Sequence, residues 1–213
     1  MRTLVIDCAT QALSIALLDG QAVTAHRHRI LGRGHAEALV PLVEEMLAGG
    51  RADAIAVDVG PGSFTGIRVG IAAARALGFA WGVPVTGYGC LPLCAAMARH
   101  GGAATGGEAI AIVMIGGHGE LFWQRFDADT LAPLAPLEST PVAELARRLD
   151  ETRVHGSAAR ALVDARGWGE AFDLYPDAAS WPLLPDAHRD LPPAALYGRD
   201  ADARPMAAAG GSR

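Results

Sequence analysis

Small residues recur at every fourth position of one apolar segment in the first half of the chain: Gly66, Gly70, Ala74 and Gly78. The spacing predicts a helix over Phe64–Trp81 with all four on one face. Each interior glycine costs about 1 kcal/mol of helix propensity relative to alanine, so this helix must be stabilised by packing. Because a face without side chains lets a second backbone approach closely, the fold has to place another element against it.

The rest of this half alternates strand and helix patterns. An Asp-Gly pair at 19–20 predicts a tight turn between two strands. Apolar residues at three- and four-residue spacing predict a helix that ends before Gly49 and Gly50. The predicted elements are strands at 3–8, 12–18, 21–29, 53–59 and 84–86, and helices at 34–47, 64–81 and 91–100.

A glycine-rich run at 101–107 predicts a boundary between two lobes, 1–100 and 108–213, the second smaller. From Tyr175 onward, prolines and small residues predict an irregular, partly mobile tail. No internal sequence repeat is visible. The predicted elements of the second lobe are strands at 109–115, 120–126 and 153–155, and helices at 141–150 and 158–165.

Composition narrows the classes of function. The 213 residues are 51% hydrophobic and 19% charged, which supports a packed core. The net charge is -5 without a dense basic run, which disfavours a chain that grips nucleic acid alone. There is no lysine, which excludes a Walker-type phosphate lysine and a Schiff base. The three cysteines form no C-x-x-C pair, and no apolar run is suited to span a membrane. We therefore predict a cytoplasmic protein with reduced thiols.

The turn before the glycine-rich helix has the composition of a phosphate loop, VGPGSFTGIRVG at 59–70. Backbone N–H groups at a helix N-terminus attract anions. However, the Walker spacing of glycines is not met when the pattern starts from Gly60 or from Gly62. A structural turn with Ser63 as helix cap is the favoured interpretation. The alternative is a vestigial nucleotide site formed with the end of the first strand, and its residues would be Asp7, Thr10, Gly60, Gly62 and Ser63.

The histidines do not form a recognisable metal set. The position four residues after His35, where a second ligand would lie on a helix, holds Leu39. His26 and His28 lie two apart on a predicted strand, without a third ligand nearby. We therefore expect no metal site, and no local Ser/His/Asp or Cys/His context indicates a catalytic centre.

Four segments together resemble the TsaB (YeaZ) family. They are LVIDCAT at 4–10, GHAEALVPLVEEML at 34–47, AVDVGPGSFTGIRVGIAAARALG at 56–78 and LYGRDADARP at 196–205. The resemblance implies an α/β chain with the actin-like ATPase (ribonuclease H-like) fold, made of two lobes with mixed sheets of which the second is reduced. One departure concerns the second lobe, where Ile115 and Gly117 replace the Asp and Arg of the family's usual Asp-Ala-Arg-x-Gly-Glu.

The resemblance also implies a non-catalytic subunit that binds and activates TsaD, with the ATPase TsaE, in threonylcarbamoylation of the tRNA adenosine beside the anticodon. The complex would use ATP and threonylcarbamoyl-AMP, with no cofactor held by this chain alone, only indirect contact with tRNA and no membrane contact. In the family the heterodimer forms through the two helices after the first sheet, and a homodimer through the same helices is the alternative assembly. The interface residues expected are His35, Leu39, Leu42, Val43, Met46, Gly66, Ile67, Gly70, Ile71, Ala74 and Gly78.

The competing hypothesis is a small actin-like ATP-binding phosphotransferase or ATPase that uses Asp7 and the turn at 60–63. A metalloprotease is a third hypothesis, for which the sequence offers no ligand set. Binding of magnesium-ATP by the isolated chain separates the second hypothesis from the first.

Overall fold

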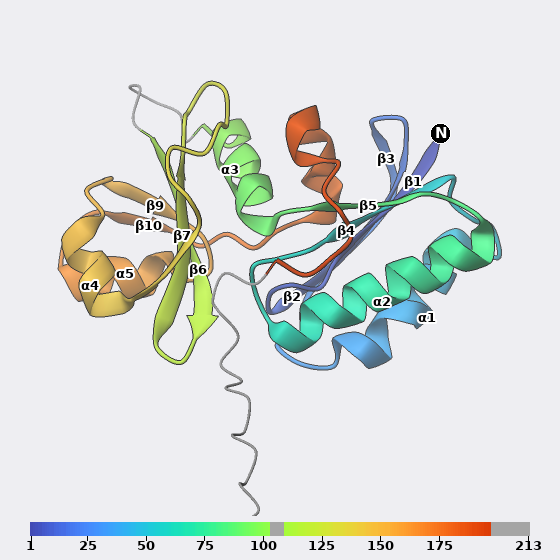
Figure 1. The fold of residues 1–213 in the computed structure, drawn as a ribbon, viewed down its shortest axis with the longest axis horizontal. Coiled ribbons are helices and arrows are strands. Elements are labelled where there is room, and N and C mark those ends of the chain that lie inside the picture. Colours follow the sequence, from blue (N-terminus) through green and yellow to red (C-terminus); the bar gives the residue numbers. More distant parts are fainter. Residues whose placement is uncertain (103–108, 197–213) are drawn as a thin grey trace, which may run out of the picture.

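The computed structural model describes residues 1–102 and 109–196 as an α/β chain of two lobes (Figure 1). The first lobe contains β1 (Arg2–Asp7), β2 (Ala12–Asp19), β3 (Ala22–Ile30), α1 (His35–Leu47), β4 (Ala54–Asp58), α2 (Phe64–Trp81), β5 (Val85–Tyr88) and α3 (Cys90–His100). The second contains β6 (Ile110–Gly117), β7 (Glu120–Phe126), β8 (Glu138–Pro141), α4 (Val142–Arg148), β9 (Arg153–His155), α5 (Ala159–Arg166) and β10 (Glu170–Phe172). Two 3₁₀ turns follow, η1 (Ala178–Leu183) and η2 (Asp186–His188).

The two sheets share one topology. The strand order is β3-β2-β1-β4-β5 in the first sheet and, read from the other edge, β8-β7-β6-β9-β10 in the second. In each sheet the first three strands are antiparallel, and the fourth and fifth run parallel to the first. The chain therefore repeats its architecture without a visible sequence repeat, and the expected pair of mixed sheets is confirmed. The second lobe is the reduced one, since β9 and β10 have three residues each.

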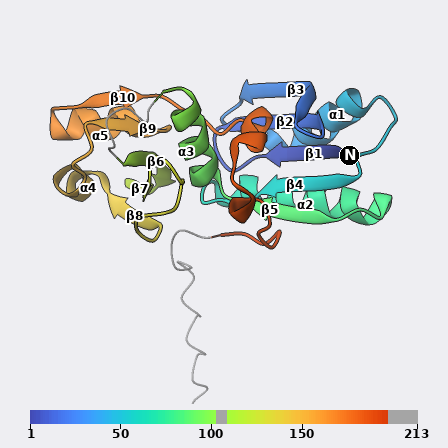
Figure 2. The same ribbon diagram turned by 90° about the horizontal axis from the view of Figure 1, so that it is seen from above.

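Three apolar clusters hold these layers together. One lies between the first sheet and helices α1 and α2, and another between the second sheet and helices α4 and α5. The third joins the lobes, because it combines side chains of both sheets with α3 and η1. Figure 2 shows α3 and the segment after β10 lying between the two sheets. Among the described helices, none combines the length and apolarity that a membrane crossing needs.

The face of α2 that carries the small residues Gly66, Gly70, Ala74 and Gly78 lies against the first sheet of its own chain. A Cβ atom added at Gly66 would lie 2.0 Å from the carbonyl oxygen of Cys8, and one at Gly78 would lie 2.3 Å from Val85 Cγ2. Glycine is required at both positions because no larger side chain fits between helix and strand. The predicted helix over Phe64–Trp81 is confirmed, with Ser63 as its N-cap and Gly82 as its C-cap.

The structure differs from the sequence prediction at short elements and at the tail. Strands β8 and β10 were not predicted, and Pro141 ends β8 instead of opening α4. Residues 175–196 of the predicted irregular, partly mobile tail pack against the rest of the chain, since Ala178 is fully buried and Leu191 pairs with Gly87 of β5. The predicted boundary at 101–107 falls mostly outside the described residues, as does the tail after residue 196.

Alanine substitutions at two glycines of α2 test this close packing. Gly66→Ala should lower the free energy of unfolding by about 3 kcal/mol, because its Cβ would overlap the Cys8 carbonyl oxygen. Gly70→Ala is the matched control, since its Cβ would have 3.4 Å to Cys8 Cβ and gains up to about 1 kcal/mol of helix propensity. Denaturant unfolding of the two variants measures the difference, and equal stabilities would contradict the packing.

Candidate functional site

Two carboxylic acids end adjacent parallel strands of the first sheet. Asp7 at the end of β1 and Asp58 at the end of β4 are 0% and 1% exposed, and their carboxyl groups share a hydrogen bond. Asp7 also accepts from the Tyr88 hydroxyl at 3.2 Å, and Asp58 accepts from the amide of Gly60 at 2.7 Å. Asp58 and Tyr88 were not singled out from the sequence, although the signal of an Asp at the end of a buried strand was there to find.

This pair holds a proton that isolated carboxyl groups would lose at neutral pH. Burial, followed by the negative charge of Asp58, raises the pKa of Asp7 well above its usual range. Burial also raises the pKa of Asp58 to about 7. Asp58 Oδ2 is buried, and a proton carried by Asp7 supplies this carboxyl group with a donor in addition to the backbone amides of Gly60 and Cys90.

The predicted nucleotide-site residues come together, but as a closed structural turn. The amide of Ser63 donates to the Ala9 carbonyl at 2.6 Å, and a Cβ at Gly62 would lie 2.0 Å from that same oxygen. The Ser63 hydroxyl accepts from the Gly66 amide, and the Thr10 hydroxyl accepts from the Ala12 amide. The chain's own backbone thus fills the space between the two loops, which favours the turn-and-cap interpretation over a phosphate cradle.

The residues predicted to face a partner do not form a surface. All eleven residues are buried, five on α1 from His35 to Met46 and six on α2 from Gly66 to Gly78, and none of their side chains is more than 9% exposed. They pack against β1, β4 and β5 or between the two helices. The small-residue face thus admits the chain's own sheet, and an interface through these two helices would have to use the side chains on their opposite side.

The opposite side of the same two helices is exposed and partly apolar. Val40 of α1 is 55% exposed, and Phe64 and Phe79 of α2 are 56% and 92% exposed. The guanidinium of Arg68 lies 3.5 Å from the ring centre of Phe64. A groove of about 340 Å³ runs between α2 and residues 194–195, with Arg68 and Arg75 on its wall. We call this side, with its groove, the outer helix face.

The histidines have structural partners. His35 Nε2 lies 3.3 Å from the carbonyl oxygen of Ala12 and ties the start of α1 to β2. His26 Nε2 lies 2.7 Å from Asp177 Oδ1. Within residues 1–102 and 109–196, no three His, Cys, Asp or Glu side chains are grouped as metal ligands. The three cysteines are buried free thiols, and burial raises the pKa of each above its usual value.

The strand order β3-β2-β1-β4-β5 of the first lobe recurs in the second as β8-β7-β6-β9-β10. Two lobes with this shared order define an actin-like α/β protein built of ribonuclease H-like lobes. A crystal structure from Pseudomonas aeruginosa, described as an uncharacterized protein with similarity to peptidase YEAZ, superimposes with a TM-score of 0.74. It is 26% identical and covers 93% of this chain and 99% of its own. A second one, YeaZ from Pseudomonas aeruginosa, gives a TM-score of 0.71 at 27% identity, over 86% of this chain and 89% of its own.

Sequence comparison agrees. The family model for TsaD, tRNA N6-adenosine threonylcarbamoyltransferase, matches residues 27–149. The tRNA threonylcarbamoyladenosine biosynthesis protein TsaB of Escherichia coli is 32% identical over 61% of this chain and 56% of its own length. An uncharacterized protein of Mycobacterium leprae is 32% identical over 96% of this chain and 56% of its own. The chain belongs to the TsaB (YeaZ) family, and it spans about half the length of these curated relatives.

Replacement of one acid of the buried pair tests the shared proton. Because the folded-state pKa of Asp58 is raised to about 7, the wild type should lose stability as pH rises from about 4 toward 8, by as much as about 4 kcal/mol. Asp58→Asn keeps an acceptor for Gly60 and supplies a donor to Asp7, so its stability should vary much less over that range. Thermal unfolding at pH 5 and pH 8 measures this, and parallel curves for both proteins would refute the shared proton.

Proposed function

We propose that this chain is a non-catalytic subunit that binds and activates a TsaD protein in the synthesis of threonylcarbamoyladenosine on tRNA. Relatives at 32% and 39% identity carry the name of that biosynthesis, and the family model that matches carries the name of the transferase. TsaE and a homodimer are further partners expected from the family resemblance. The proposal places the complex in the cytoplasm.

The outer helix face carries this proposal. Three large apolar side chains on it, Val40, Phe64 and Phe79, are more than half exposed. Exposed aromatic residues together with arginine are typical of protein interfaces. The first sheet holds both helices rigidly from behind, so the face is preformed and a partner need not order it.

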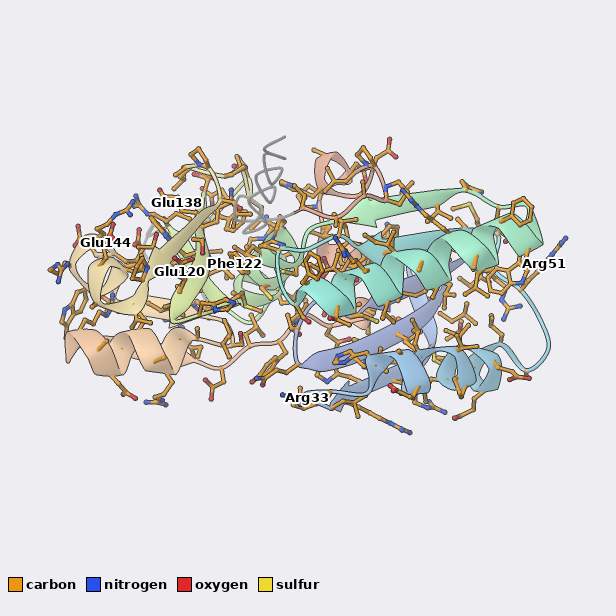
Figure 3. The ribbon with its side chains drawn as sticks, turned by 60° about the horizontal axis from the view of Figure 1, so that its bottom comes forward. Arg33, Arg51, Glu120, Phe122, Glu138 and Glu144 are labelled. Atoms are coloured by element: carbon orange, nitrogen blue, oxygen red, sulfur yellow. The ribbon has the colours of Figure 1, made fainter. Side chains whose placement is uncertain are left out.

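Charged side chains flank these apolar residues, with arginines along α2 and the exposed Glu37 and Glu44 one turn either side of Val40 on α1. Arg33 and Arg51 lie near opposite ends of α1 (Figure 3), and Arg68 and Arg75 lie on α2. A partner that docks on the outer helix face should therefore present apolar side chains, with acidic ones where it meets α2.

The polar groups at the strand ends support a role without catalysis. Asp7 bonds to Ala9, Tyr88 and Asp58, and all of these groups are inside the chain. A metal or phosphate would have to displace these bonds and open the contact between Ser63 and Ala9. In the proposed complex, ATP and threonylcarbamoyl-AMP are handled by the other subunits, and tRNA is contacted only indirectly.

One substitution on the outer helix face tests partner binding. Phe79 is 92% exposed, so Phe79→Glu should leave the stability of the chain unchanged. It places a buried charge at the interface and should weaken binding to purified TsaD from the same organism at least tenfold, or about 1.4 kcal/mol. Calorimetric titration of TsaD with each variant gives the dissociation constants.

Leu134→Glu is the matched control, because Leu134 is also exposed, at 51%, but lies in the second lobe. Equal affinity of Phe79→Glu and Leu134→Glu would place the interface elsewhere. Absence of binding by the wild type would remove the proposed partner. Heat on titration of the isolated chain with magnesium-ATP would instead favour a small actin-like ATPase.

A further inference from the structure

The chain crosses back to the first lobe after β10. Residues 174–196, here called the strap, leave the second sheet, run over the face of the first sheet that α1 and α2 do not cover, and end beyond β5 beside α2 (Figures 1 and 2). Turn η1 packs against α3 and against strands β1, β2 and β3. Ala178 and Leu184 are buried in the cluster that also contains Phe122 and Phe126 of the second lobe. The strap therefore belongs to the core that joins the lobes.

Asp177 fixes the strap to one edge of the first sheet. Its Oδ1 accepts from the Ser14 hydroxyl of β2 at 3.1 Å and from the Ala179 amide at 2.9 Å. The Ser14 hydroxyl in turn accepts from the Ala178 amide at 2.9 Å. His26 Nε2 of the edge strand β3 lies 2.7 Å from the same oxygen, and this contact is an ion pair when the imidazole is protonated.

These three side chains are not a catalytic triad. Ser14 is fully buried, and its hydroxyl donates to the carboxylate and has no contact with the imidazole. A serine nucleophile needs a base in contact with its hydroxyl and access to substrate. The cluster thus binds the strap to the sheet and does no chemistry.

The other end of the strap is fixed at the opposite edge. Leu191 and Gly87 of β5 exchange two backbone hydrogen bonds of 2.6 Å and 3.0 Å, and the amide of Leu196 donates to the Val59 carbonyl at 2.7 Å. A Cβ at Gly87 would lie 2.8 Å from the Pro192 carbonyl oxygen, so this contact also requires glycine. Between the two ends, His188 Nε2 lies 3.3 Å from the carbonyl oxygen of Leu131 in the second lobe.

We propose that the strap holds the two lobes at a fixed angle and that Asp177 is its latch. The strap bonds to β2 and β3 at one edge of the first sheet, to β5 at the other, and to the second lobe between them. Rotation of one lobe against the other would break these contacts together. The contact of Asp177 with two strands makes it the position where one substitution releases the strap.

Two measurements on the full chain test the latch. Asp177→Ala should speed hydrogen–deuterium exchange of the amides at 178–184 at least tenfold, because it removes three contacts at once. Spin labels at Arg51→Cys and Arg160→Cys report the distance between lobes, and the buried native thiols leave these two exposed sites to react. The distance distribution should broaden in Asp177→Ala.

Two control variants distinguish loss of the Asp177 contacts from a general loss of stability. Asp186→Ala alters an aspartate of the same strap whose side chain is 99% exposed, and it should leave exchange and distance unchanged. His26→Ala keeps the Ser14 contact and should give a smaller effect in the same direction. Exchange in Asp177→Ala equal to that of Asp186→Ala would overturn the proposal, and so would faster exchange with an unchanged lobe distance.

Discussion

Backbone contact between the start of α2 and the end of β1 is the constraint on which the first lobe depends. The carbonyl oxygens of Cys8 and Ala9 lie where side chains at Gly66 and Gly62 would be, so helix and strand touch without side chains between them. This contact sets the height of α2 above the sheet and positions the turn at 60–63. The outer helix face is exposed because the inner face is used in this way.

The same contact determines the environment of the buried acids. Because the turn closes over the strand ends, Asp7 and Asp58 lose water and must satisfy each other through a proton. In an open cleft the same two groups would be charged and available to a ligand. The turn therefore closes these two acids into the core of the lobe, while its exposed apolar side chains lie on the far side of α2.

Long elements could be predicted from the sequence, and contacts between distant elements could not. The helix over Phe64–Trp81 was predicted with its ends because Ser63 and Gly82 mark them, whereas the three-residue strand β10 is too short to show a period. The small residues at every fourth position of α2 indicated that some backbone approaches this helix closely. Only the fold shows that this backbone is the end of β1 in the same chain. Asp177 lies 163 residues from Ser14, and no local pattern joins them.

The return of the strap has a consequence for biosynthesis. The first sheet is made early, yet the segment that covers its inner face and pairs with β5 is among the last of the described residues to leave the ribosome. Until then, Val5, Ala16 and Leu18 have no cover from that segment. The first lobe therefore reaches its final packing only after the second has been synthesised, so a chain that stops before residue 178 would present this apolar surface to chaperones and proteases.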